Sequence, residues 1–188
     1  MKCWIFLFLF TFIGCKKNPN RVEKMSANNG ENYIKNYFKN NSKIKMEVYS
    51  QKDHKLLIVK EFENRSTIKI TEFYPNGDKK LIATLLHKPN FFGIKNYSKN
   101  GKKESEGSIL YNDKTDKLTP VSDWLFFNKQ TGEIDSMGHY FSDGKVSLLV
   151  EVERISKKDK KIKKIKYFEV MPTDTLRDSI TWQIKRVR

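Results

Sequence analysis

The stretch that decides the fold is SDWLFFNKQTGEIDSMGHYFSDGK, residues 122–145. Two aromatic runs, at 124–127 and 140–141, each lead into a short polar segment that ends in glycine, first Gly132 and then Gly144. Aromatic side chains favour strands, and glycine in a short polar turn accepts the positive φ that a tight hairpin needs. The stretch therefore predicts antiparallel strands joined by short turns.

The same arrangement recurs closer to the N-terminus. Gly77 and Gly101 follow the aromatic residues of EFYPNG and NYSKNG, and the four turn glycines are 24, 31 and 12 residues apart. A spacing of 12 fits one hairpin, 24 fits two, and 31 fits two hairpins with an insertion, which we expect within NDKTDKLTP, residues 112–120. The repeated unit predicts an antiparallel meander.

This unit resembles the bacterial variant of MORN repeats over about residues 72–146. The residues at the family's positions in the best-matching stretch are Trp124, Phe126, Phe127, Gly132, Gly138, Tyr140 and Gly144. The resemblance implies an extended or gently curved single-layer sheet of hairpins that offers a broad face to a partner. Some members of the family are labelled antitoxin components, and no catalytic residue carries over from it.

The rest of the chain adds further short strands and one helix. Apolar and polar residues alternate at 43–50 and 67–74, as in half-buried strands. Further strands are expected at 55–62, 79–86, 92–98, 105–111, 122–128, 134–141, 145–155, 162–171 and 179–187. In ENYIKNYFKNN, Tyr33, Ile34, Tyr37 and Phe38 lie at i, i+1, i+4 and i+5, which predicts a short helix near 31–40. The predicted fold is all-β, an antiparallel meander of repeated hairpins with a short N-terminal helix, in one domain over residues 31–188.

The N-terminal residues predict export and lipidation. The apolar run 4–13 has about half of the roughly 20 residues that span a bilayer, and with Lys2 it forms the parts of a signal peptide. Phe12-Ile13-Gly14-Cys15 resembles the lipobox of bacterial lipoproteins. The resemblance implies cleavage after residue 14, lipidation and N-acylation of Cys15, and a place on the extracytoplasmic side of a membrane in the cell envelope. A plain secretory leader is the alternative, and residues 15–30 predict a flexible tether.

No catalytic or metal-binding signature is found in the sequence. His54, His87 and His139 have no ligand spacing, and Asp113 and Asp116 fit a polar turn better than a calcium loop. The chain has only two cysteines, both within its first 15 residues, which excludes a disulfide framework. We therefore predict a protein without enzymatic activity, cofactor or metal.

The formal net charge of +15 points towards anionic surroundings. Its sharpest local feature is SKKDKKIKKIK, residues 156–166, whose β-branched and aromatic flanks favour a hairpin over a helix. The lysines of this candidate patch for acidic glycan or lipid heads are Lys157, Lys158, Lys160, Lys161, Lys163 and Lys164. The alternative is a solvated hairpin tip that protects a sheet edge. The export signal disfavours nucleic acid as a partner.

These observations together predict a non-catalytic envelope lipoprotein that acts as a binding or scaffold module for a protein partner. The candidate binding face consists of Tyr97, Trp124, Phe127 and Tyr140. Because side chains alternate between the faces of a strand, we expect some of these aromatic residues to be buried. The alternatives are an anionic-ligand binder that uses the lysine-rich hairpin, and an immunity or antitoxin-like protein.

Overall fold

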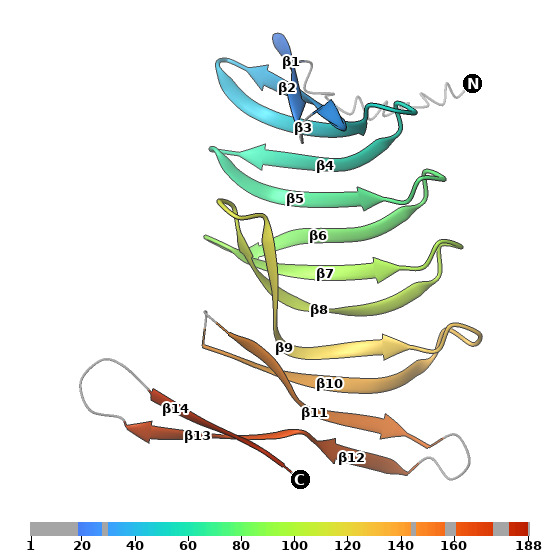
Figure 1. Cartoon of the computed structure of the whole chain (residues 1–188), viewed down its shortest axis with the longest axis vertical. Helices are drawn as coiled ribbons and strands as arrows, with labels where there is room; N and C mark the ends of the chain where they lie inside the picture. The colour runs from blue at the N-terminus through green and yellow to red at the C-terminus, as the bar shows by residue number, and fades with distance from the viewer. Residues whose placement is uncertain (1–18, 28–29, 144–145, 157–160, 175–180, 188) are drawn as a thin grey trace, which may run out of the picture.

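The computed structural model describes residues 19–27, 30–143, 146–156, 161–174 and 181–187. Within them, twelve strands form one antiparallel sheet in chain order, and two more strands form a separate hairpin sheet. The strands of the large sheet stack along the long axis of the molecule (Figure 1). Their bounds are β1 Arg21–Ala27, β2 Asn32–Lys39, β3 Ser42–Ser50, β4 Leu56–Glu63, β5 Ser66–Phe73, β6 Lys79–His87, β7 Phe91–Tyr97, β8 Lys103–Asn112, β9 Lys117–Phe127, β10 Ile134–Ser142, β11 Ser147–Ile155, β12 Ile162–Lys166, β13 Phe168–Asp174 and β14 Thr181–Arg186. The predicted all-β meander is confirmed.

Two predictions at the N-terminal end are wrong. The segment expected to be a helix, 31–40, is strand β2, and part of the expected tether, 15–30, is strand β1, which pairs along its whole length with β2. Strand β2 carries bulky residues on both faces, because Tyr33 stacks on Tyr49 of β3 while Ile34 points the other way, opposite Val48. Because bulky residues lie on both faces, the sequence of β2 lacks the simple apolar and polar alternation that marks a strand.

The predicted turn glycines take up the expected conformation. Gly77, Gly101 and Gly132 have φ of 90°, 76° and 75°, and each amide donates back across its turn, for example from Gly101 to the carbonyl of Ser98 at 2.9 Å. No atom lies within 4 Å of a Cβ added at any of the three, so the backbone angle and not space requires glycine there. Gly144 lies outside the described residues.

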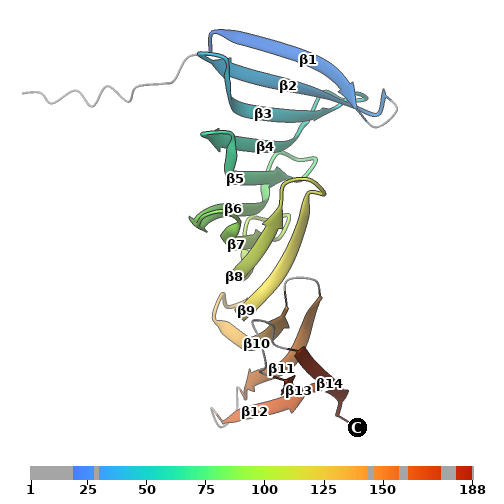
Figure 2. The same cartoon turned by 90° about the vertical axis from the view of Figure 1, so that its left-hand side faces the viewer.

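The predicted insertion is the tip of the β8–β9 hairpin, and it folds back over the sheet. Strand β9 bends at Ser122, whose φ is 59°, and only its second half pairs with β10. The hairpin tip then crosses the face of β6 and β7 to reach β4 and β5 (Figures 1 and 2). There Thr67 donates to Asp113 at 2.6 Å, and the buried Lys60 ammonium contacts Asp116 and donates to Tyr111 Oη at 3.0 Å.

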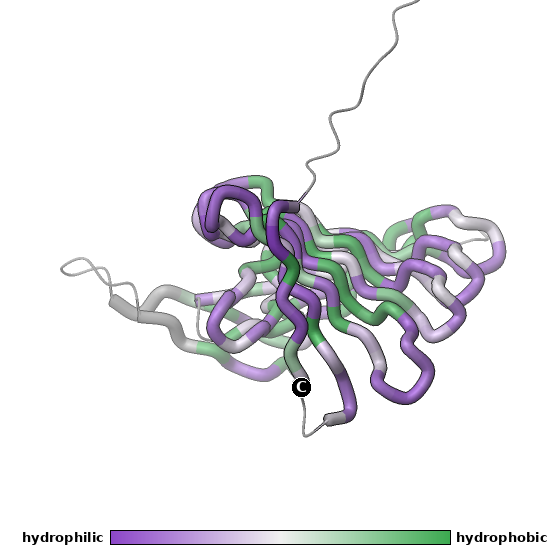
Figure 3. The backbone as a smooth tube through the Cα atoms, turned by 90° about the horizontal axis from the view of Figure 1, so that it is seen from above, coloured by the Kyte–Doolittle hydropathy of each residue, from purple (hydrophilic) through white to green (hydrophobic). Residues whose placement is uncertain are grey.

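The folded tip divides the sheet into two different faces. We call the face beneath it the covered face; it carries the core cluster of Ile70, Leu81, Ala83, Phe92, Ile94, Ile109, Tyr111 and Trp124. The opposite side is the open face. Trp124 packs directly over Gly107, where an added Cβ would lie 2.5 Å from the indole ring. Hydrophobic residues accordingly gather in the middle of the strands and hydrophilic ones at the turns (Figure 3).

The C-terminal end carries a small second sheet. The strand expected over 162–171 is divided at Tyr167 into β12, which pairs with β11, and β13, which pairs with β14. The Tyr167 amide donates to the Val150 carbonyl at 2.8 Å, and the Val187 amide donates to the Tyr167 carbonyl at 2.9 Å. These bonds hold the β13–β14 hairpin beside β11.

Candidate binding surface

The four aromatic residues of the predicted binding face do not share one face. Trp124 is buried in the core cluster with 7% of its surface exposed, its Nε1 donates to the Ser108 carbonyl at 3.0 Å, and the Tyr140 ring packs 5.8 Å from its own. Burial also raises the pKa of Tyr140. These two side chains therefore build the covered face, with Trp124 buried and Tyr140 half-buried.

Phe127 and Tyr97 lie on the open face. Phe127 is three residues from Trp124 along β9, so its side chain points to the opposite side of the strand. The Lys103 ammonium lies 4.0 Å from the centre of the Phe127 ring and 3.1 Å from a Glu106 carboxylate oxygen. Tyr97 pairs with Lys103 in the sheet and, like Glu106, lines a hollow on this face.

This hollow has a volume of about 650 Å³ and crosses β6, β7, β8 and β9. Its lining includes apolar side chains and charges of both signs: Ile82, Leu86, Lys95, Tyr97, Glu106, Asp123 and Leu125. Leu86 is an extra residue in the β6–β7 pairing, and its side chain lies over Gly93, 3.1 Å from the position of an added Cβ. Because Leu86 remains 53% exposed, it offers apolar surface at this point of the open face.

A second feature of the open face, which the sequence patterns did not predict, is a tyrosine and carboxylate cluster on β2 and β3. The Glu47 carboxylate is buried, accepts from Tyr49 at 2.8 Å and from Tyr37, and pairs with Lys45 at 2.8 Å. Burial opposes ionisation of Glu47, but the hydrogen bonds from Lys45 and the two tyrosines outweigh it and lower the pKa of Glu47. Burial and the same carboxylate raise the pKa of Tyr37 to about 12.

Lysines cover the aromatic rings of this end. Lys24 of β1 lies 4.4 Å from the centre of the Tyr33 ring, and Lys35 lies 4.8 Å from that of Tyr49. The Tyr33 and Tyr49 rings stack with centres 4.9 Å apart. Tyrosine and lysine two residues apart, as at 33 and 35, are the sequence signal that could have revealed this arrangement.

The strands on either side of residues 157–160, β11 and β12, pair antiparallel, as predicted for a hairpin. Lys157, Lys158 and Lys160 lie outside the described residues. Lys164 contacts Glu153 and lies 3.7 Å from Glu151, while Lys163 on the same strand is exposed. Part of the predicted positive charge is therefore matched by carboxylates of the neighbouring strand.

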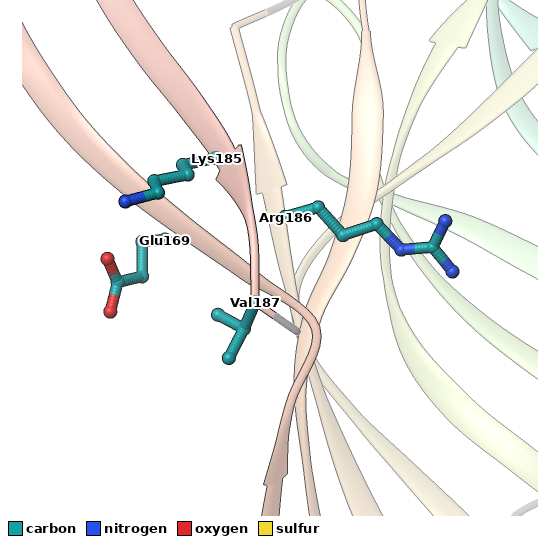
Figure 4. Close-up of a pocket in the computed structure, with 4 residues that line it drawn as sticks. All are labelled: Glu169, Lys185, Arg186 and Val187. Carbon is teal, nitrogen blue, oxygen red and sulfur yellow. The ribbon is translucent and has the colours of Figure 1, made fainter.

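The β13–β14 hairpin borders a hollow of about 540 Å³. Glu169 and Lys185 are cross-strand neighbours and extend to the same side, whereas Arg186 extends to the other side of the hairpin (Figure 4). Because its charged groups diverge, this hollow does not gather them around a common point.

The remaining predicted polar residues have different surroundings. Asp113 and Asp116 hold the hairpin tip, and the hydrogen bonds from Lys60 and Tyr111 lower the pKa of Asp116 although its burial acts the other way. His54 lies beside Tyr33, with ring centres 5.9 Å apart. His139 lies on the open face with Asp123 and Glu153 near its two ring nitrogens. The sequence spacing of the histidines did not reveal this contact, because the partners come from neighbouring strands.

Comparison with protein-family models and with curated protein sequences finds no match to this chain. In the part of the chain that the structure describes, no helix has the length and apolar character needed to cross a membrane. Residues 1–18, which include the predicted signal peptide and Cys15, lie outside that part.

Proposed function

We propose that the protein is a non-catalytic, lipid-anchored binding module of the bacterial cell envelope, and that it holds a protein partner on the open face of its sheet. The observation that supports this most directly is the hollow across β6 to β9, where Leu86 and Tyr97 lie on a face that the hairpin tip leaves uncovered. A partner that fills the hollow would bury apolar surface there, which is the main favourable term in protein association.

The chemistry of the hollow favours a protein over a polyanion. Its lining combines apolar Ile82 and Leu125 with Lys95, Glu106 and Asp123. A polyanion selects a surface of one sign, whereas apolar surface bordered by charges of both signs is typical of a protein interface. We therefore assign the open face to a protein contact.

The proposed anchor would hold this face close to the membrane. If Cys15 carries the lipid, six residue steps lead to Arg21, where β1 begins, and these span at most about 20 Å when fully extended. The proposed tether is thus shorter than residues 15–30, because 21–27 are paired in the sheet.

A matched pair of charge substitutions tests the proposed interface. Leu86→Glu places a carboxylate in the hollow, and Val146→Glu places one at an exposed apolar residue of another region; the two native side chains are 53% and 46% exposed. We expect crosslinking of the protein in cells to yield a partner adduct with the parent and with Val146→Glu, and to lose it with Leu86→Glu. An adduct that persists in Leu86→Glu would contradict the proposed interface.

The anchor has a separate test. Radiolabelled fatty acid should enter the parent protein, and Cys15→Ala should abolish both the label and its recovery with membranes. Labelling that survives Cys15→Ala would contradict the lipoprotein assignment and leave the interface test unaffected.

Binding of acidic glycan or phospholipid through the lysine-rich hairpin is a second candidate function, favoured by the net charge of +15 and by the exposed Lys163. Such binding should weaken steeply as salt is added, whereas an apolar protein contact should barely respond. Absence of binding to acidic vesicles and acidic glycans at low salt would remove this candidate. An immunity or antitoxin-like role follows only from the resemblance to MORN repeats.

A further inference from the structure

A row of ionisable side chains crosses the open face near its C-terminal end. Asp123, His139, Glu151 and Lys166 are successive cross-strand partners on β9, β10, β11 and β12, and Glu153 lies two residues along β11 on the same face. His139, Glu151, Glu153 and Lys166 of this row line a hollow of about 370 Å³, to which Phe168 and Val170 of β13 contribute. The groups are therefore brought together between the two sheets and not spread over a flat surface.

The hydrogen bonding of His139 leaves one ring nitrogen without a partner. Nδ1 lies 2.7 Å from Asp123 Oδ1, and because an ionised carboxylate only accepts, the imidazole donates from Nδ1. In the neutral ring Nε2 then carries a lone pair. Among the described residues this atom has no hydrogen-bond partner although it is buried, and it lies 3.8 Å from Glu153 Oε1, another acceptor. Two acceptors that face each other need a proton or a bound cation between them.

We propose that His139, Glu151 and Glu153 bind a divalent transition-metal ion, for which Zn²⁺ is the expected ion. One ligand atom from each of the three lies within 4.8 Å of the others. Ligands about 2.1 Å from one ion are at most about 4.2 Å apart, so a small side-chain rotation closes the set. The imidazole nitrogen favours Zn²⁺ over Mg²⁺ and Ca²⁺, which prefer oxygen ligands.

Asp123 would act as a positioning residue for this site. A carboxylate that accepts from the far nitrogen of a metal-binding histidine fixes the ring orientation and makes the ligating nitrogen more basic. The Asp123–His139 contact already has this form, because it involves Nδ1 and directs Nε2 towards the two glutamates.

Lys164 competes for the same two carboxylates. Its ammonium contacts Glu153 and lies 3.7 Å from Glu151, while its side chain is 62% exposed and has room to turn into solvent. A bound metal ion must displace this ammonium. Removal of the lysine charge should therefore strengthen metal binding, whereas a plain ion-pair cluster with no metal function predicts no gain.

The test is titration of the untagged full-length chain, in detergent, with ZnCl₂ and with MgCl₂ by calorimetry. Every variant carries Cys3→Ser and Cys15→Ser, so that neither thiol binds zinc. We expect one Zn²⁺ per chain, no comparable heat from Mg²⁺, and visible d–d absorption from Co²⁺ bound in the same place. His139→Gln should weaken Zn²⁺ binding by at least about tenfold, Asp123→Asn by about tenfold, and Lys164→Gln should tighten it severalfold.

His87→Gln is the matched control, because His87 is an exposed histidine far from this row in the sequence, and it should leave the affinity unchanged. Equal affinities for the parent and His139→Gln would overturn the proposal. So would a Lys164→Gln variant that binds Zn²⁺ no more tightly than the parent, because the row would then be an ion-pair cluster only.

Discussion

The centre of the sheet and its N-terminal end stabilise a single layer of strands in different ways. Between β5 and β9, apolar side chains are buried under the folded β8–β9 tip, with Phe92 and Ile109 each 1% exposed. On β1 to β3 the buried groups of the open face are instead Tyr33 and the Glu47 carboxylate, with lysines over the aromatic rings. A sheet without a second sheet over its face can therefore gain order from its own hairpin or from ladders of polar and aromatic contacts.

The largest effect is expected in the covered core. Phe92→Ala removes a ring that packs edge-on against Tyr111, 5.5 Å between centres, and leaves a cavity beneath the hairpin tip. Such truncations cost about 3–5 kcal/mol. Urea denaturation should show this loss of unfolding free energy; a loss below 1 kcal/mol would mean that the tip does not seal a core.

The next effect is steric. Gly107→Ala places a methyl group 2.5 Å from the Trp124 ring, which is held by neighbours, and we expect a loss of about 1–3 kcal/mol in unfolding free energy. Gly93→Ala is the matched control, because its methyl group would meet only the movable end of Leu86 at 3.1 Å. Equal losses for the two variants would contradict the assignment of Gly107 to the covered face.

The polar cluster should respond to pH. The folded-state pKa of Glu47 is lowered, so its contribution to stability is present above the ordinary value of 4.5 and is lost as pH falls through the folded value. Glu47→Gln should cost about 1–2 kcal/mol at pH 7 and flatten the acid side of the stability profile. Thermal melts from pH 7 to pH 3 measure both. An unchanged acid profile would show that Glu47 is not ionised in the folded protein.

The smallest effect is expected for a single lysine over a ring. Lys24→Met keeps the aliphatic stem above Tyr33 but removes the charge, at a cost of about 0.5 kcal/mol. Lys114→Met, in the exposed turn of the β8–β9 tip, is the control and should cost less. The measurement is chemical denaturation of the parent protein and both variants, and the expected result is a denaturation midpoint that is lower for Lys24→Met than for Lys114→Met. A larger loss for Lys114→Met would contradict a role for the Lys24 charge.

The repeated hairpins could be predicted from sequence because their signals are local. Each turn signal, like the alternation near 67–74, involves residues within a few positions of one another. The structure has turns and a strand at these places. Even the insertion before Pro120 was evident from the spacing of Gly101 and Gly132. Strand β1 was missed because six of its seven residues are exposed on a sheet edge, where no buried face imposes a period of two.

Side-chain partners were harder to predict because they depend on register. A bulge in β10 between Ile134 and Ser136 and the bend at Ser122 decide which aromatic residues face the core. Trp124 and Phe127 are close in sequence but lie on opposite faces, so the predicted four-residue face was split. In the same way, Glu47 and His139 acquired their partners only when neighbouring strands came into register.

The bonds of the hairpin tip also have a consequence for the order of folding. Neighbours in the large sheet are consecutive in the chain, so the meander can assemble one hairpin after another. The contacts of Lys60 with Asp116 and of Thr67 with Asp113 instead join residues 56 and 46 positions apart. They close a long loop, form late, and couple β4 and β5 to β8 and β9. A stack that would otherwise fray strand by strand is thereby expected to open as one cooperative unit between β4 and β9.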